Sequence, residues 1–166
     1  MDKTAFYKLS YGLYLLTAKA GGKENGCIIN TAIQCASDPK LISICVINKN
    51  LTCDMIKETG TFNISVLGED AGPELFKRFG MQSGRDVDKE SAAHLTLEEP
   101  SVIRTPGIRE VPLTLECKVL YQQDQVLSEI PDEVISRFYS RGTDAEDFHT
   151  AYIAQIVDAY IIKEDA

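Results

Sequence analysis

Two short apolar segments near the start of the chain restrict the fold most strongly. Cys27–Ile33 and Leu41–Ile47 are separated by Asp38-Pro39 and are too short for buried helices of ordinary length. Runs of this kind, bounded by turn residues, favour β-strands. The second is almost continuously apolar, which predicts a strand buried on both faces of its sheet. Small polar residues accompany both segments, so polar groups are expected at the ends of neighbouring strands.

The remaining pattern predicts a mostly antiparallel β protein. Leu9–Ala18 should pair with Cys27–Ile33 across the turn Gly21–Gly26, because Gly-Gly and Asn-Gly favour hairpin turns. Further strands are predicted at Phe62–Leu67, Leu113–Tyr121 and 150–162. Short helices are predicted at Cys53–Thr59 with Thr52 as N-cap, at Pro73–Gly80 and at Pro131–Tyr139.

About six strands result, and the helices do not alternate regularly with them. This disfavours a doubly wound α/β sheet and favours a closed or partly closed β-barrel. At 166 residues, the chain 1–166 is expected to form a single domain. Met81–Arg109 is the least regular region and is interpreted as a long excursion, either a lid or a dimer arm.

Composition excludes several classes of function. A net charge of −8 argues against general nucleic-acid binding, although a local basic pocket remains compatible with it. No apolar run reaches the length of a membrane helix, and the first residues lack a signal core, so a cytoplasmic protein is expected. The five cysteines form no C-x-x-C pair and only two histidines are present, which gives metal binding little support. Most of the cysteines are expected in the core.

The polar residues at two strand ends carry the remaining chemical signal. The chain has neither G-x-G-x-x-G after a strand nor a P-loop lysine motif, so a nucleotide cofactor would be held differently. Asn30-Thr31-Ala32 could meet the edge of a flat aromatic ligand. Lys49 and Thr52 could hold its anionic tail at a helix N-terminus. The alternative is that these residues merely cap turns.

Several segments, in this order, resemble the flavin reductase-like family of FMN-binding split barrels. The resemblance covers about residues 8 to 90 and returns at 149–159. It is carried by Gly12–Ala18, Asn25–Thr31, Thr52–Leu67 and Phe79–Lys89.

The resemblance implies a mainly β protein: a six-stranded antiparallel Greek-key split β-barrel with a few short helices. It also implies a homodimer with one non-covalent FMN per subunit near the dimer interface. By the family pattern, the flavin ring would be lined by Asn30, Thr31, Ala32, Ile33 and Gln34, with Ser37 close by. The ribityl phosphate would be held by Lys49, Asn50 and Thr52, and the site closed by Ser83 and Arg85. His149 would lie where the nicotinamide of NADH or NADPH approaches the flavin.

The chain also departs from the family pattern. Ser37-Asp38-Pro39-Lys40 stands in place of the usual Ser-x-x-Pro-Pro, and Ala154 and Gln155 replace a glycine and an acid. Segments 90–111 and 130–147 have no counterpart. The expected function is an NAD(P)H-dependent flavin reductase. The alternatives are an FMN electron carrier for a rubredoxin-like or diiron protein, and a structural or interaction barrel without flavin.

Overall fold

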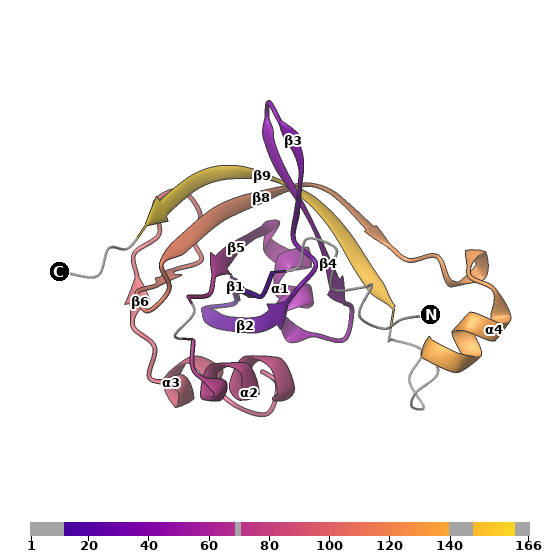
Figure 1. The fold of residues 1–166 in the computed structure, drawn as a ribbon, viewed down its shortest axis with the longest axis horizontal. Helices are drawn as coiled ribbons and strands as arrows, with labels where there is room; N and C mark the ends of the chain where they lie inside the picture. Colours follow the sequence, from indigo (N-terminus) through magenta and orange to yellow (C-terminus); the bar gives the residue numbers. More distant parts are fainter. Residues whose placement is uncertain (1–11, 69–70, 140–147, 162–166) are drawn as a thin grey trace.

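The computed structural model describes residues 12–68, 71–139 and 148–161, which form a mainly β fold (Figure 1). The strands are β1 Tyr14–Ala20, β2 Lys23–Ile29, β3 Ile33–Ser37, β4 Lys40–Ile47, β5 Thr61–Val66, β6 Leu97–Glu98, β7 Gly107–Ile108, β8 Leu113–Asp124 and β9 His149–Ile161. The helices are α1 Leu51–Thr59, α2 Pro73–Met81, α3 Lys89–Ala93, the 3₁₀ turn η2 Leu127–Glu129, α4 Asp132–Val134 and the π-helical η3 Ile135–Tyr139.

Seven strands form one sheet in the order β2-β1-β5-β8-β9-β4-β3, and every neighbouring pair is antiparallel. β6 and β7 form a separate two-stranded sheet. The long strands β8 and β9 arch over β1, β5 and α1 (Figure 1). The prediction of a mainly β, antiparallel fold with a few short helices is therefore confirmed, but the strands outnumber the six that were expected.

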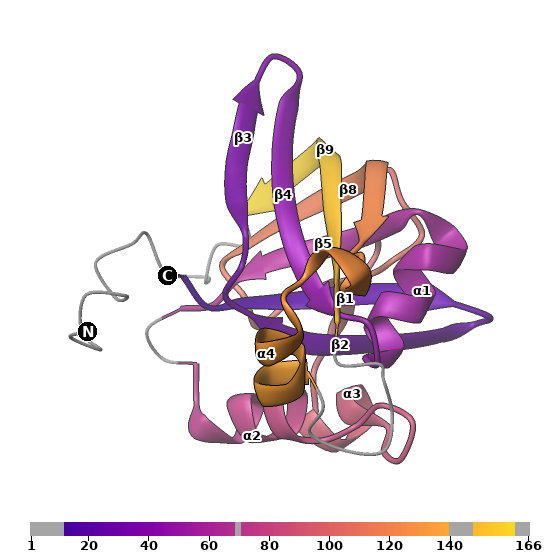
Figure 2. The ribbon, with the colours of Figure 1, turned by 90° about the vertical axis from the view of Figure 1, so that its right-hand side faces the viewer.

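One extra strand arises where the chain leaves β2. The sequence pattern treats Cys27–Ile33 as one strand, but β2 ends at Ile29 and β3 begins at Ile33. The Thr31 hydroxyl donates to the Cys45 carbonyl (2.7 Å) and accepts from the Cys45 N–H (3.3 Å). A side chain thus occupies the β4 backbone groups that a continuous strand would pair with. Within the described ranges β3 pairs only with β4, and this hairpin projects beyond the rest of the sheet (Figure 2).

A second error is the expectation that β4 is buried on both faces. Ile42, Ile44 and Val46 are buried, whereas Cys45 between them is exposed, although its backbone pairs with Ala151 of β9. The described residues therefore cover only one face of β4 at this point. The core interpretation of the cysteines holds for Cys27, Cys53 and Cys117 and is wrong for Cys35 and Cys45.

Glycines position the turns and one close packing contact. Gly21 and Gly22 form the β1–β2 turn with φ of +57° and +77°, and Gly60 ends α1 with φ of +66°. Gly26 lies inside β2, where a Cβ would approach the Phe79 ring and the Leu16 carbonyl oxygen to 3.1 Å. Its lack of a side chain lets α2 pack directly on β2. No helix in the described part of the chain is long and apolar enough to cross a membrane.

The irregular region after α2 is partly fixed to the barrel. Ile103 and Ile108 are buried, and Ile108 packs in a small cluster with Leu15 and Phe79. The fully buried Glu116 carboxylate of β8 accepts three backbone N–H groups at 2.7–2.9 Å, from Ser101, Val102 and Ile103. The second half of the excursion is therefore part of the folded core and not a free lid.

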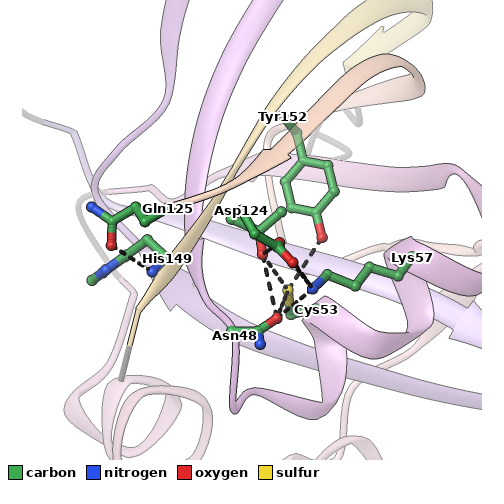
Figure 3. Close-up of polar contacts among 8 residues, drawn as sticks. Asn48, Cys53, Lys57, Asp124, Gln125, His149 and Tyr152 are labelled. Carbon is green, nitrogen blue, oxygen red and sulfur yellow. Dashed lines mark hydrogen bonds and ion pairs between the residues drawn. The ribbon is translucent and has the colours of Figure 1, made fainter. Parts of the chain in front are cut away.

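A polar network joins α1 to the adjacent ends of β4, β8 and β9 (Figure 3). The Thr150 hydroxyl donates to Asp124 (2.6 Å) and to Asn48 Oδ1 (3.3 Å). Lys57 Nζ of α1 lies 3.0 Å from Asp124 and also donates to Asn48 Oδ1. Next to them, Cys53 Sγ lies 3.2 Å from the Tyr152 hydroxyl. These contacts fix the start of β9 against the helix that follows β4.

This network predicts that the free energy of unfolding decreases at acidic pH. The Thr150 hydrogen bond, followed by Lys57, lowers the pKa of Asp124. A carboxyl whose pKa is lower in the folded state adds stability above its unfolded pKa of about 3.9, and this is lost as the pH falls through the folded value. We therefore expect Asp124→Asn to destabilise the protein at pH 7, by less than about 1 kcal/mol because the group is half exposed.

Urea unfolding at pH 7 and below pH 3 measures this effect. The difference between wild type and Asp124→Asn should be present at pH 7 and shrink towards zero in acid. Glu58→Gln, on the exposed surface of α1, is the matched control for removing one charge. A difference that stays constant with pH would contradict the role given to the Asp124 carboxylate.

Candidate functional site

Three segments distant in sequence enclose a cavity of about 310 Å³. They are the centre of β2, the junction between β4 and α1, and the loop after α2. The residues lining the cavity are Asn25, Cys27, Lys49, Asn50, Leu51, Thr52, Gly80, Met81, Gln82, Ser83, Gly84, Arg85 and Lys89. All five predicted phosphate-site and closing residues belong to this set: Lys49, Asn50, Thr52, Ser83 and Arg85.

The β4–α1 junction presents the start of a helix to this cavity. Asn50, and not Thr52 as expected, is the N-cap of α1, and among the described residues its side chain makes no capping hydrogen bond. First-turn N–H groups of α1 are therefore left without a side-chain acceptor from the cap, and such groups attract anions. Thr52 is the second residue of α1 and fully buried, and its hydroxyl accepts from Asn25 Nδ2 at 2.8 Å.

The loop after α2 approaches β2 closely enough to require glycine. A Cβ at Gly84 would lie 1.9 Å from Asn25 Oδ1. The neighbouring Ser83 hydroxyl accepts from the Arg85 backbone N–H at 3.2 Å, which shapes the turn. The Arg85 guanidinium forms an ion pair with Asp54 of α1. The loop is thereby held over the helix start, with its polar groups facing the cavity.

Lys89 is the lining residue that sequence reasoning missed. Its side chain is 4% exposed, and among the described residues its ammonium donates only to two carbonyls, Gly26 (3.0 Å) and Phe79 (3.4 Å). It also lies 5.9 Å from the centre of the Phe79 ring. Burial lowers the pKa of Lys89. A buried ammonium with neutral partners is costly, and an anion in the cavity would compensate it.

A signal for this lysine appears only once α3, a helix that the sequence analysis did not predict, is known. Lys89 opens α3, where the positive end of the helix dipole disfavours a cation. A lysine at the first position of a helix, four residues after Arg85, therefore suggests a reason other than helix stability. The Cys27 thiol forms another wall of the cavity, and burial raises the pKa of Cys27 to about 11, so it is protonated at neutral pH.

The six predicted ring residues are described, but none of them lines this cavity. Asn30, Thr31 and Ala32 connect β2 to β3, and Thr31 bonds to Cys45 as described above. Ile33, Gln34 and Ser37 lie in β3 on the projecting hairpin. The Gln34 amide donates locally to the Ala36 carbonyl and the Ser37 hydroxyl at 3.5 and 3.4 Å. Their role in binding a ring therefore stays a prediction.

His149 lies at the start of β9, next to the end of β4. It pairs with Ile47 across the two strands, and Asn48 N–H donates to the Phe148 carbonyl at 2.9 Å. On the other side Gln125 makes two contacts with the His149 backbone. The Gln125 side-chain oxygen accepts from the His149 N–H (2.8 Å), and the Gln125 backbone N–H donates to the His149 carbonyl (3.0 Å) (Figure 3). The histidine backbone is thus held within two residues of the Lys49-Asn50 segment.

Comparison with known proteins identifies the family of the chain. The family described as flavin reductase like domain matches residues 6–166. A ferric-chelate reductase (NAD(P)H) of Archaeoglobus fulgidus is 30% identical over 164 residues, which cover 99% of this chain and 92% of that protein. A high molecular weight rubredoxin of Moorella thermoacetica is 40% identical over 99 residues, covering 60% of this chain and 43% of that protein.

Solved structures show the same fold. Flavoredoxin from Methanosarcina acetivorans superposes with a TM-score of 0.71 at 21% identity, covering 91% of this chain and 68% of that one. A flavin reductase with a split barrel domain from Shewanella frigidimarina gives 0.72 at 18% identity, covering 97% and 75%. The match over nearly the whole chain and the shared split barrel together establish that this protein belongs to the flavin reductase-like family.

Proposed function

We propose that the chain 1–166 is a single FMN-binding domain and acts as an NAD(P)H-dependent flavin reductase. The observation that carries this proposal is the cavity at the start of α1, which is lined by both a buried ammonium and a helix N-terminus. When bound, FMN supplies the hydride and electron chemistry, and the protein binds, orients and shields it. No strong side-chain acid or base is needed for this role.

The ribityl phosphate is proposed to occupy the cavity of about 310 Å³. Lys89 supplies a buried positive charge, and Lys49 and Arg85 add charges from two other segments. The first-turn N–H groups of α1 and the Ser83 hydroxyl donate hydrogen bonds. Donors from three separate segments surround one small anion, which suits a phosphate better than a carboxylate because a phosphate has more acceptor oxygens.

The flavin ring is proposed to lie along Asn30, Thr31, Ala32, Ile33 and Gln34, with Ser37 near its edge. Support comes from the chain connection, since this segment follows β2, whose Asn25 and Cys27 line the phosphate cavity. The open outer face of β4, with Cys45 exposed and Thr31 bonded to it, offers a surface for a planar group. A ring here would also lie towards His149, which is across the end of β4.

A second candidate function is supported by one relative. The high molecular weight rubredoxin of Moorella thermoacetica contains a region 40% identical to 99 residues of this chain. An FMN protein of this kind could pass electrons to a rubredoxin or diiron partner without oxidising NAD(P)H itself. Steady-state oxidation of NADH and NADPH with free FMN as acceptor separates the reductase from the electron carrier.

The first test concerns the phosphate. We expect the protein to bind FMN more tightly than riboflavin, because charge-assisted hydrogen bonds contribute about 1.5–3 kcal/mol each. Lys89→Met should weaken FMN binding roughly ten- to hundredfold and leave riboflavin binding unchanged. Because the variant also removes a buried charge, the flavin-free protein should keep its melting temperature.

Isothermal titration with both flavins and a thermal melt of each protein provide the measurements. Lys118→Met, on the exposed face of β8, is the matched control and should bind FMN like wild type. Equal affinities of the wild type for FMN and riboflavin would rule out the phosphate site.

The second test concerns His149, which is proposed to contact the nicotinamide nucleotide as a hydrogen-bond donor. His149→Ala should raise the KM for NAD(P)H and lower kcat/KM about tenfold, since one such bond contributes roughly 1–2 kcal/mol. FMN affinity should not change. Stopped-flow reduction of the bound flavin by NADH and by NADPH measures this, with His94→Ala as the control for the other histidine. Unchanged reduction at all nucleotide concentrations would leave His149 with a structural role.

The third test concerns assembly, for which we propose a homodimer. The dimer is proposed to bury parts of the segments 81–109 and 130–147. Each exposes an apolar side chain among its described residues: Met81 is 83% and Phe138 is 53% exposed. Exposed apolar side chains that gather in a patch mark interaction surfaces. The two-fold dimer, which would cover them, is the commonest homo-oligomer. Light scattering should give twice the chain mass of 18.4 kDa, and Phe138→Asp should shift the protein towards a monomer. A wild-type monomer at micromolar concentration would refute the dimer.

A further inference from the structure

The backbone of His149 is held by a side chain at the point where the β8–β9 ladder ends. The last pair of that ladder is Asp124 with Thr150. One residue further, the Gln125 N–H donates to the His149 carbonyl at 3.0 Å, which is one of the two bonds that a regular antiparallel pair exchanges. The second bond goes elsewhere: the His149 N–H donates to the Gln125 side-chain oxygen at 2.8 Å (Figure 3). The Gln125 side chain therefore takes the place of its own carbonyl, so the chain leaves the sheet without releasing His149.

The nitrogen of the same amide holds the segment that follows β8. Gln125 Nε2 donates to the Tyr139 hydroxyl at 3.3 Å. Tyr139 is the last residue of η3 and is half-buried. The two contacts require one orientation of the amide, because a flipped amide would turn its NH₂ group towards the His149 N–H. A single exposed glutamine thus links the start of β9 to the 127–139 segment, part of which has no counterpart in the family pattern.

His149 is anchored differently on its two sides. Towards β4 it pairs with Ile47, as the last pair of the β4–β9 ladder. Towards β8 its N–H is held by the Gln125 side chain. A substitution of Gln125 can therefore loosen His149 without changing β4 or the phosphate cavity, which Gln125 does not line. The direction of the imidazole follows from the backbone at residue 149, and a displacement of about 1 Å is enough to weaken a contact with a reacting group severely.

We propose that Gln125 is a positioning residue for the hydride donor. It fixes the backbone of His149 so that the imidazole points towards the nicotinamide nucleotide, and Tyr139 fixes Gln125 in turn. This inference rests on the proposed function, because His149 is proposed there to contact NAD(P)H. Gln125 itself touches neither the flavin nor the nucleotide and acts through His149. The affinity for NAD(P)H therefore depends on the segment after β8, whereas the affinity for FMN does not.

Hydrogen exchange of the flavin-free protein, followed by NMR, tests whether Gln125 holds His149. Gln125→Leu nearly keeps the size of the side chain and removes both of its contacts, so the His149 amide should exchange at least about tenfold faster than in wild type. Tyr139→Phe removes only the contact of the amide nitrogen and should have a smaller effect of the same kind. Gln122→Leu, on the exposed surface of β8, is the matched control and should exchange like wild type.

Stopped-flow reduction of the FMN-loaded protein by NADH and by NADPH tests whether this position matters for the nucleotide. Gln125→Leu should raise the KM for the nucleotide about three- to tenfold and leave the FMN affinity, measured by isothermal titration, within about twofold of wild type. The same substitution in a His149→Ala protein should change the KM less than about twofold, because an effect exerted through the imidazole vanishes once the imidazole is removed. Gln122→Leu should again behave like wild type.

The outcomes separate this inference from the proposed function. Unchanged exchange of the His149 amide, or an unchanged KM, in Gln125→Leu overturns the inference, and so does a loss of FMN affinity in that variant. An equal rise in KM with and without the His149 imidazole also overturns it, because Gln125 would then act on the fold in general. An effect of His149→Ala without one of Gln125→Leu leaves the proposed function standing. If His149→Ala alone leaves reduction unchanged, the proposed role of His149 fails and the positioning role of Gln125 fails with it.

Discussion

The pairing of β8 with β9 is the constraint on which the rest of the structure depends. These two strands are the longest in the fold, and they join the β2-β1-β5 half of the sheet to the β4-β3 half. Two irregularities in their register, at Glu116/Cys117 and at Val119/Tyr121, accompany the arch over α1 (Figure 1). At one end of this ladder the buried Glu116 holds the 101–103 segment. At the other end Asp124 and Thr150 meet Lys57 of α1. These contacts of β8 and β9 therefore help to fix the position of α1, and with it the candidate phosphate cavity, although neither strand lines that cavity.

Part of the lining of the candidate phosphate cavity could be predicted from the sequence because its signal is local. A polar turn that leads from a buried strand into a helix places Lys49, Asn50 and Thr52 together, whatever the rest of the fold does. The loop residues Ser83 and Arg85 required the family resemblance, since nothing in their local pattern connects them to that turn. Lys89 was missed because its burial depends on contacts with β2 and α2, which are distant in sequence.

The errors in the strands have the same origin. Alternation of apolar and polar residues reports how many faces of a strand are covered only when its neighbours are known. β4 has an apolar sequence but carries the exposed Cys45, because the described residues cover only one face of the strand where it pairs with β9. The start of β3 was missed because the Thr31 hydroxyl, and not a change in hydrophobicity, occupies the Cys45 backbone groups of β4, so that β3 pairs with β4 only from Ile33. A hydrogen bond made by one side chain leaves no periodic trace in a sequence.

Gly84 has a consequence for how this site tolerates mutation. A Cβ at this position would overlap the Asn25 side chain, and Asn25 is the donor to the buried Thr52 hydroxyl. Any residue larger than glycine must either displace the loop outward or break the Asn25–Thr52 contact at the start of α1. The loop and the helix therefore cannot vary independently. A methyl group added at Gly84 would displace the Asn25 amide, and this displacement would disturb the start of α1. Gly84, Asn25 and Thr52 lie on three different segments and are linked by these contacts. The linkage restricts which substitutions the site can accept.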